Sequence, residues 1–335
     1  MYDITKPLDI HVHIVGNGSR KSGCTLAGGG PIHSLLYAYM ERHIGLPAGA
    51  MKGDLDHVFS AHLARLMAKS SLGGAAVFAQ DNVYNAAGRR MKSRGTYYVP
   101  NDFVFKVCRK YPQLLPVCSI HPARADAMDE LNRCIELGAV MMKLLPNCHN
   151  VNCNDPKYRK FWQRMADAKL PLLNHTGGEN TLDVVNAKYS DPRTMTLPLE
   201  CGVTLIAAHC AGKSGIGDPE YFDDLLRMMQ KFPNLYADQS ALNLPIRSRL
   251  FSRLFDDLIS SRLVHGSDYP VPVTGLWVWL RGMIDWETYR RIQRIPNVIE
   301  RDYQIKRALG FPDDVFLRGW KLLRLPKPNN SVLEK

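Results

Sequence analysis

Long apolar runs, paired cysteines and an apolar leader segment are all missing from this chain of 335 residues. No stretch reaches the roughly 18 uninterrupted apolar residues that a membrane span needs, so we expect no membrane anchor. The first residues, MYDITKPLDIHVH, lack the apolar core of a signal peptide, which makes a cytoplasmic location the default expectation. The eight cysteines form no CxxC pair, so buried thiols are expected rather than disulfides.

A recognisable nucleic-acid-binding module is also missing, although the net charge of +11 is basic. The basic residues concentrate in the last third of the chain, where they are typical of a solvated surface, and we expect no nucleic-acid partner. A positive field steers anionic molecules toward a protein, so the charge favours an anionic small-molecule substrate. The composition leaves assembly into a homo-oligomer open.

Short apolar runs alternate with amphipathic stretches along most of the chain. The runs are nearly continuous in apolar residues, as expected for strands that are buried on both faces. The predicted strands are 8–15, 75–80, 115–120, 140–145, 171–174, 203–208, 235–238 and 262–265. The predicted helices include 56–70, 101–111, 125–137, 157–170, 221–232 and 246–261. Eight parallel β-α units favour closure into a (β/α)8 TIM barrel.

The spacing of these units departs from regularity after the first strand. His13 and Lys143 are 130 positions apart, where three units take about 100. The excess predicts a long loop insertion at 16–51, with one short helix, over the mouth of a distorted barrel. We expect a single domain over residues 1–325, with two or three additional C-terminal helices in 277–325, and a polar, disordered tail at 326–335.

The first predicted strand carries an alternating polar pattern. Asp9, His11 and His13 occupy every second position, so strand geometry points all three side chains to one side, into the barrel. Neutral imidazoles crowded in an apolar barrel need a common partner, and a cation accepts both nitrogens at once. Asp9 is then expected to support the histidines rather than to bind the cation.

Three later strands share one sequence pattern at their ends. An apolar run is followed by a residue that can bind a metal, and then by residues that end a strand. These segments are LPLLNHTGG with His175, VTLIAAHCAG with His209 and LVHGSDYP with Asp268. Each places its polar side chain where a strand gives way to a loop, which is the face on which barrel enzymes build their sites. The pattern predicts that these residues meet at one end of the barrel.

The motifs DIHVH, NHTGG, AAHC and GSDYP, in this order, resemble the amidohydrolase superfamily, and more narrowly its amidohydrolase 2 group. The likeness extends over residues 8–270. It implies a distorted barrel, a metal held by His11 and His13, and Asp268 as ligand and proton carrier. It also implies that His175 and His209 are further ligands or polarise the substrate, and the residues alone do not rank these two. We take the metal ligands to be His11, His13, His175 and Asp268.

The expected catalytic residues are Asp268, His209 and Lys143, the last of these in AVMMKLLPN at the end of the fourth strand. In binuclear relatives a lysine on this strand is carboxylated and bridges two metals, whereas in mononuclear relatives it is not a bridge. We favour one ion, with Lys143 near the substrate. Mixed imidazole and carboxylate ligation suits Zn best, with Mn, Fe or Co as alternatives.

Weaker candidates lie on the neighbouring loops. His121, Arg124 and Glu179 are expected to contact the substrate, although a structural histidine and solvated side chains are equally ordinary readings. Asp238 closes the seventh strand and is placed to line the pocket. His265 falls on the opposite side of its strand from Asp268, so we expect it to pack between barrel and helices.

These residues predict a metal-dependent hydrolase of a small molecule, with an amide, lactone or related ester bond as its target. A metal-activated water would attack, and Asp268 would act as general acid and base. The alternative enzyme is a decarboxylase of an aromatic or unsaturated acid on the same site. A third interpretation is a catalytically inactive barrel that binds a metal or a partner and turns over no substrate.

Overall fold

The computed structural model describes residues 1–26 and 31–325, with no side-chain detail for residues 31–37. Within these residues the main sheet has eight strands, each paired in parallel with its neighbours. They follow chain order around the sheet: β1 (Leu8–His13), β3 (Gly74–Phe78), β5 (Leu114–Cys118), β6 (Met141–Leu144), β7 (Leu172–Asn174), β8 (Leu205–Ala207), β9 (Leu235–Asp238) and β10 (Leu263–Val264). All eight predicted strands are present.

The sheet closes through backbone hydrogen bonds between β1 and the segment that begins at the end of β10. The amide of Ile10 donates to the carbonyl of His265 at 3.1 Å, and that of Asp268 donates to His11 at 2.8 Å. The amide of His13 donates to Tyr269 at 2.7 Å. The expected distorted (β/α)8 barrel is therefore confirmed, and its closure sets Asp268 beside the histidines of β1.

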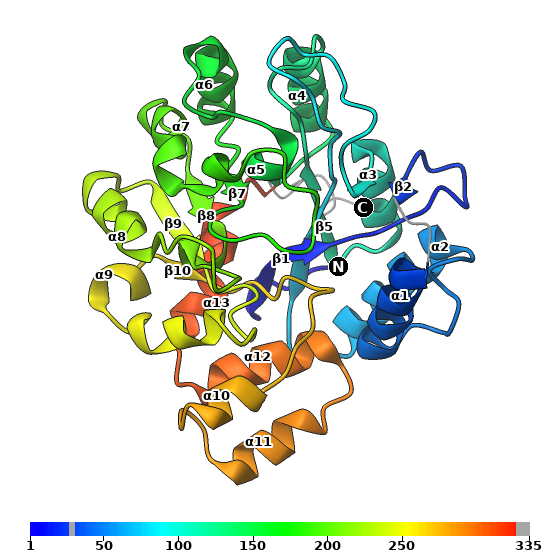
Figure 1. Cartoon of the computed structure of the whole chain (residues 1–335), viewed down its shortest axis with the longest axis vertical. Coiled ribbons are helices and arrows are strands. Elements are labelled where there is room, and N and C mark those ends of the chain that lie inside the picture. The colour runs from blue at the N-terminus through cyan, green and yellow to red at the C-terminus, as the bar shows by residue number, and fades with distance from the viewer. Residues whose placement is uncertain (27–30, 326–335) are drawn as a thin grey trace, which may run out of the picture.

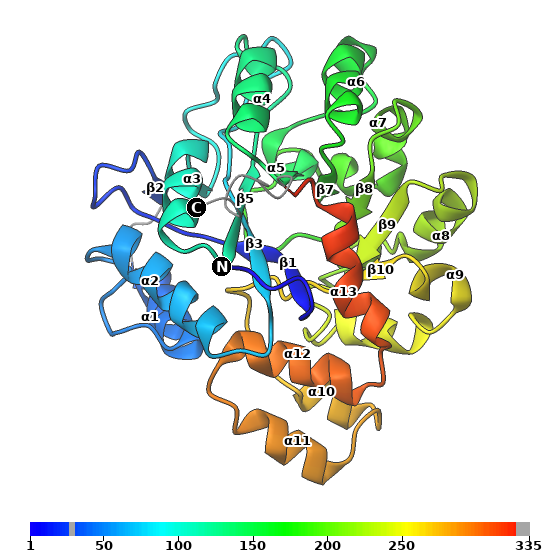
Figure 2. The same cartoon turned by 180° about the vertical axis from the view of Figure 1, so that it is seen from behind.

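Helices surround the strands, as Figures 1 and 2 show from opposite sides. Those of the barrel units are α2 (Leu55–Ala68), α3 (Asn101–Lys110), α4 (Ala127–Glu136), α6 (Arg159–Asp167), α7 (Thr196–Glu200), α8 (Phe222–Lys231) and α9 (Asp257–Ser260). The others are α1 (Pro31–Ile44), α5 (Pro146–His149), α10 (Leu276–Leu280), α11 (Trp286–Gln293), α12 (Val298–Ala308) and α13 (Asp313–Leu322). Short 3-10 turns are η1 (Pro156–Tyr158), η2 (Ala187–Ser190), η3 (Pro192–Met195), η4 (Ala208–Ala211) and η5 (Arg247–Arg253).

One predicted helix was wrong as a continuous element. Residues 246–261 form the 3-10 turn η5 and then the short helix α9. Asp256 interrupts the run because its backbone is extended at ψ 137° and its side chain accepts a hydrogen bond from the amide of Leu258, which starts a new helix. The region after residue 275 also differs in number, with α10 to α13 where two or three helices were expected.

The insertion after β1 lies against the loop that follows β3. Strand β2 (Thr25–Leu26) pairs antiparallel with β4 (Tyr97–Tyr98), so the two long loops share a ribbon near the barrel mouth. The predicted short helix of the insertion is α1. The predicted polar tail at 326–335, like residues 27–30, lies outside the described residues.

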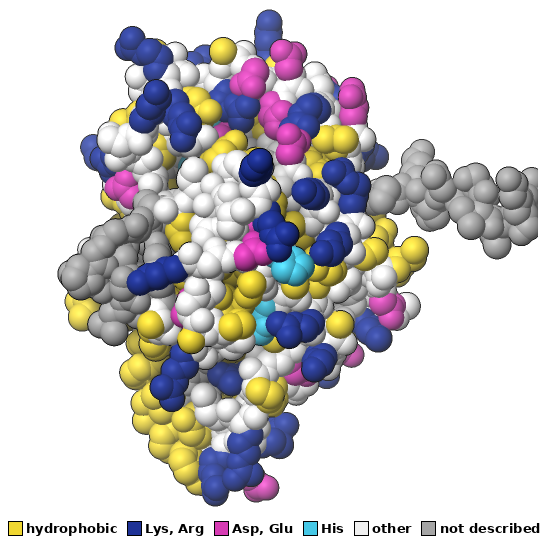
Figure 3. Space-filling model, turned by 90° about the vertical axis from the view of Figure 1, so that its right-hand side faces the viewer, with side chains coloured by type: hydrophobic (Ala, Val, Ile, Leu, Met, Phe, Trp, Pro, Cys, Tyr) yellow, Lys and Arg dark blue, Asp and Glu magenta, His cyan; other side chains and the backbone are white. Residues whose placement is uncertain are grey.

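All eight cysteines are free thiols, and seven of them are buried, as the sequence predicted. None of the helices in the described ranges combines the length and apolar character that crossing a membrane requires. Figure 3 shows Lys and Arg side chains spread over one face of the molecule rather than gathered in a continuous stripe.

Helix α13 and the residues that follow it contact β1, the residue before β6 and the segment after β10. The carbonyl of Val315 accepts the amide of His265 at 3.0 Å, and the amide of Arg324 donates to Val140, just before β6, at 2.9 Å. Figure 2 shows the helix lying across the strands as seen from that side. A methyl group at Gly319 would come within 2.6 Å of Cγ2 of Ile10 and 3.0 Å of Cδ2 of Leu8, so the helix backbone packs directly on β1.

We expect Gly319→Ala to lower the free energy of unfolding by about 1–2 kcal/mol. Overpacking against Ile10 and Leu8 outweighs the gain in helix propensity of roughly 0.5–1 kcal/mol. Chemical denaturation measures the effect, with the exposed Lys321→Ala of the same helix as control. Unchanged or increased stability of Gly319→Ala would show that this contact is not close.

Candidate metal centre

The polar side chains predicted to meet do meet at the C-terminal ends of the strands. His11 and His13 lie on β1, His175 follows β7, His209 lies in η4 after β8, and Asp268 follows β10. His13 is largely buried and the other four are buried. Because the strands are parallel, their carboxyl ends share one edge, and side chains far apart in sequence are brought together there.

The tightest convergence joins His11, His13 and Asp268. The Nε2 atoms of His11 and His13 lie 3.0 and 3.1 Å from Oδ1 of Asp268. Donor atoms around a tetrahedral ion at about 2.1 Å lie roughly 3.4 Å apart, so this spacing needs little change to accept one. Imidazole nitrogen and carboxylate oxygen are donors that Zn and similar divalent ions bind. The three residues therefore fit a metal chemically and geometrically.

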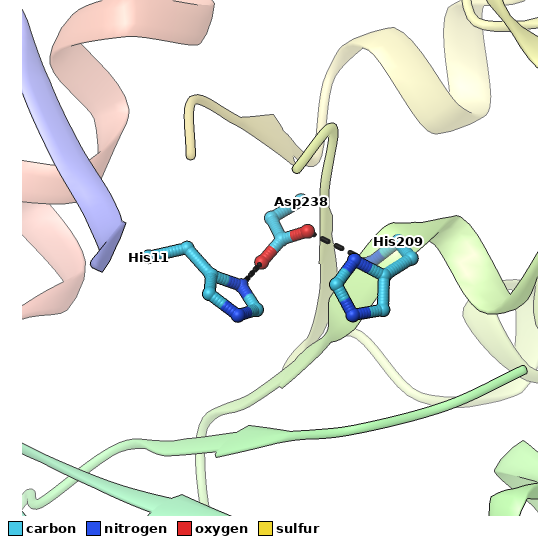
Figure 4. Close-up of side chains that lie close together, drawn as sticks. All are labelled: His11, His209 and Asp238. Carbon is cyan, nitrogen blue, oxygen red and sulfur yellow. Dashed lines mark hydrogen bonds and ion pairs between the residues drawn. The ribbon is translucent and has the colours of Figure 1, made fainter. Parts of the chain in front are cut away.

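A second group of ligand-type side chains shares His11 and adds His209 and Asp238. Figure 4 shows how the carboxylate of Asp238 lies between the two histidines. Oδ2 contacts Nδ1 of His11 at 2.6 Å, while Oδ1 accepts the backbone amide of His209 at 2.8 Å. Asp238 thus engages the ring nitrogen of His11 that points away from Asp268. We read it as the carboxylate that orients His11, leaving Nε2 free to ligate.

The charges of this cluster support ionised carboxylates. Burial lowers the pKa of His11, and so does the charge of Lys143, but Asp238 and Asp268 outweigh both and raise it. Burial would raise the pKa of Asp268, yet the imidazoles of His11 and His209 bring that pKa well below its usual range. Burial would likewise raise the pKa of Asp238, but the charge of His11 and its hydrogen bond outweigh burial and lower that pKa. Both carboxylates are therefore anionic at neutral pH, the form that binds a cation.

His209 is held in a strained backbone. Its φ of 58° lies in the left-handed region, as do those of Cys210 and Ala211, and Asp268 has a φ of 67°. Such conformations are costly for residues other than glycine and cluster at functional sites. Nδ1 of His209 lies 3.1 Å from the carbonyl oxygen of Ser240, which fixes the proton on that nitrogen and leaves Nε2 as an acceptor.

His175 lies beside this cluster but outside the two groups of ligand-type residues. Its ring centroid is 5.0 Å from that of His209, and its Nε2 is 3.8 Å from Oε2 of Glu179. This buried Nε2 has no hydrogen-bond partner among the described residues. An orphaned buried nitrogen is costly and fits a site that is completed by a cation or a substrate. Its role as a metal ligand stays a prediction.

Lys143 is fully buried, with Nζ 3.1 Å from Nε2 of His11 and 5.1 Å from the centroid of the Phe78 ring. Burial lowers the pKa of this lysine to about 8, although Asp238 and Asp268 oppose the shift. The amine therefore loses its proton more readily than a solvated lysine, and it lies beside the nitrogen that would bind the metal. The choice between a free and a carboxylated Lys143 stays open.

Two of the expected substrate contacts lie in a separate polar network. Nε2 of His121 lies 2.9 Å from the carbonyl oxygen of His149. The guanidinium of Arg124 pairs with Asp81 at 3.1 Å and with Asp126 at 2.7 Å. Both side chains already have protein partners, and their contact with substrate stays a prediction. His265, as expected, packs away from the site against Tyr303 and Phe316.

Tyr97 and Arg247 belong to the site but were missed by the sequence prediction. The hydroxyl of Tyr97 is 2.9 Å from Nδ1 of His13. Arg247 is buried, donates to the carbonyl of Gly178 at 2.6 Å, and keeps an Nε with no partner in the described ranges. Tyr97 falls where the sequence predicted no strand or helix, and Arg247 falls at the start of a predicted helix, so neither position carried a local signal. Asp238 did carry one, since it ends a strand as the other site residues do.

Solved structures share the fold of this chain at low sequence identity. An uncharacterized TIM-barrel protein from Bordetella bronchiseptica has a TM-score of 0.58 at 17% identity, covering 91% of this chain and 99% of its own. A probable 2-pyrone-4,6-dicarboxylic acid hydrolase from Acinetobacter baumannii, with citric acid bound, has 0.55 at 13%, covering 93% and 99%. The 5-carboxyvanillate decarboxylase from Sphingomonas paucimobilis has 0.55 at 12%, covering 96% and 99%. At these identities the likeness shows the fold alone.

No curated protein matches the sequence. Residues 8–289, which run from β1 past Asp268, match the family described as Amidohydro_2, amidohydrolase. The match covers most of the chain, and the His and Asp donors at the barrel mouth suit the metal dependence of that family. The chain therefore belongs to the amidohydrolase family and is a metal-dependent enzyme.

Proposed function

We propose that the enzyme hydrolyses an amide, lactone or related ester bond in a small molecule, with one divalent cation at the barrel mouth. His11, His13, His175 and Asp268 would hold the ion, most favourably Zn, with Mn, Fe or Co as alternatives. The observation that carries the proposal is the convergence of two Nε2 atoms on Oδ1 of Asp268, at 3.0 and 3.1 Å. The orphaned Nε2 of His175 supports a further ligand.

A divalent ion in such a site supplies Lewis-acid polarisation and an acidified water. Oδ1 of Asp268 faces the two histidines of β1, whereas Oδ2 lies 4.0 Å from Nδ1 of His209. We assign to Oδ2 the acceptance of the proton from the attacking water and its return to the leaving group. His209, with its proton held toward Ser240, keeps Nε2 as an acceptor that would bind the water or the substrate.

The role that we propose for Lys143 follows from its contact with His11, because a metal ion and the Lys143 amine would use the same lone pair on Nε2 of His11. Nε2 of His11 has a single lone pair, so it cannot both accept the Lys143 hydrogen bond and ligate a metal. Ligation would release the N–H groups of Lys143 toward the mouth, where they can polarise the substrate carbonyl. A carboxylated Lys143 that bridges two ions is the alternative, and the ion count separates the two.

Decarboxylation of an aromatic or unsaturated acid is the second candidate. The structural neighbours include the 5-carboxyvanillate decarboxylase as well as the pyrone dicarboxylic acid hydrolase. Buried Arg247, with an Nε free of partners in the described residues, is a cation suited to hold a carboxylate beside the metal. Assays of carbon dioxide release and of acid production across aromatic acids, lactones and amides separate the reactions.

We expect elemental analysis of the purified protein to find about one divalent ion per chain, because His11, His13 and Asp268 converge on a single position. His11→Ala with His13→Ala should abolish the metal content, since two of the four ligands are gone. The exposed His57→Ala controls for adventitious binding and should keep the full content. Two ions per chain would instead support the carboxylated Lys143, and full metal content in the double variant would overturn the assigned site.

We expect Asp268→Asn to reduce kcat/KM for the best substrate of the panel by about 10²-fold or more, because the amide cannot accept the proton of the water. Asp257→Asn, a change at an exposed position in α9, should leave kcat/KM unchanged. A wild-type protein that holds metal but turns over no substrate of the panel would favour a catalytically inactive barrel and contradict the proposed hydrolase function.

We expect Asp238→Asn to weaken metal affinity by about 10–100-fold while the protein stays folded, because the variant no longer holds the Nδ1 proton of His11 by charge. Competition with a chelator of known affinity measures the change, and circular dichroism checks the fold. An unchanged metal affinity would show that the carboxylate does not orient His11.

A further inference from the structure

A cavity of about 200 Å³ lies beside the candidate metal centre. Its walls come from β2, from the loop after β3 with β4, from α5 and from residues 182–183, and include Gln80, Arg90, Lys92, Tyr97 and His149. An apolar cavity of about 150 Å³ holds a benzene molecule, so this space suits a small ring or a short acid. None of the proposed metal ligands lines it.

Tyr97 is the wall that the cavity shares with the metal centre. Its hydroxyl lies 2.9 Å from Nδ1 of His13, on the ring whose Nε2 faces Asp268. Burial raises the pKa of Tyr97, and the charges of Asp268 and Glu179 raise it further, so the phenol keeps its proton. Only the side chain of Tyr97 therefore separates a molecule in the cavity from His13, a proposed metal ligand.

The cavity carries positive charge that the protein does not neutralise. The two carboxylates that line the cavity are already neutralised by ion pairs. Asp81 pairs with Arg124 at 3.1 Å, and Asp183 pairs with Arg94 at 2.7 Å. Arg90 and Lys92 are exposed, and neither forms an ion pair within residues 1–26 and 31–325. Two cations at the rim thus remain for an anion from solution.

The buried amide of Gln80 supplies a second feature that points to an anion. Nδ1 of His149 accepts the amide of Leu145 at 3.3 Å, and burial lowers the pKa of this histidine to about 3, so its single proton is on Nε2. Nε2 of Gln80 faces that N–H at 2.9 Å, and two donors cannot bond to each other. We therefore assign the Gln80 amide the opposite orientation, with its oxygen toward the ring. Its NH₂ group then occupies the buried position of Oε1, which has no partner in the described residues.

We propose that this cavity is a carboxylate-binding subsite, which receives the acid group of the substrate between Arg90, Lys92 and the amide of Gln80. The substrate class is then a small carboxylic acid whose reactive carbonyl or carboxyl group extends past Tyr97 toward the metal centre. This assignment rests on the proposed function for the direction of the substrate, whereas the binding of a carboxylate can be measured without turnover.

Isothermal titration calorimetry of the metal-loaded protein with isophthalate tests the subsite. Isophthalamide serves as the uncharged probe of the same shape. We expect Arg90→Gln with Lys92→Gln to weaken isophthalate binding by about 10-fold or more, because charge-assisted hydrogen bonds are lost, and to leave isophthalamide binding unchanged. Arg89→Gln is the matched control, since Arg89 is an exposed cation of the same loop that does not line the cavity.

Equal isophthalate affinity in the wild type and the double variant would overturn the subsite, as would no isophthalate binding by the wild type at millimolar concentration. An equal loss in Arg89→Gln would also overturn it, because the effect would then be that of general charge. Failure of the proposed function has a different signature, in which the affinities follow the expectation and no member of the hydrolase and decarboxylase panels is turned over.

Discussion

The site depends on how the barrel closes. The amide of Asp268 donates to the carbonyl of His11 at 2.8 Å, and that of His13 donates to Tyr269 at 2.7 Å. These bonds join the first strand to the segment after the last one, and they set Oδ1 of Asp268 against Nε2 of both histidines. Asp268 adopts a left-handed backbone at φ 67°, and the backbone hydrogen bonds of Asp268 and Tyr269 with β1 hold this strained residue in place. Helix α13 reinforces this junction by packing on β1 and accepting the amide of His265.

Asp238 links the electrostatics of the site to its geometry. The carboxylate accepts the backbone amide of His209 and contacts Nδ1 of His11, so one anion holds together residues that are distant in the sequence. It lies at 0% exposure, where an unpaired charge is costly, and these bonds are what allow it to stay ionised. The same bonds turn Nε2 of His11 toward Asp268. The imidazole ring of His11 therefore joins the two buried carboxylates of the cluster, Asp238 and Asp268.

Local patterns were enough for most of the fold and for the strand-borne part of the site. The alternation in DIHVH predicted that His11 and His13 point the same way, and apolar runs predicted where His175, His209 and Asp268 follow their strands. The break at Asp256 was missed because it depends on the capping of one turn. Tyr97 and Arg247 were missed because their partners, His13 and Gly178, are 84 and 69 positions away in the sequence.

By itself the sequence determined the barrel and the end of it that carries the polar residues. Strand periodicity and the order of strand ends are local properties, and parallel pairing then places those ends on one edge. Only the tertiary structure decided which nitrogen of His11 faces Asp238 and which faces Asp268. The tertiary structure alone also created the cavity beside Tyr97, because its wall combines residues from four separate parts of the chain. Distances between side chains that are distant in sequence depend on closure and packing, which no local pattern contains.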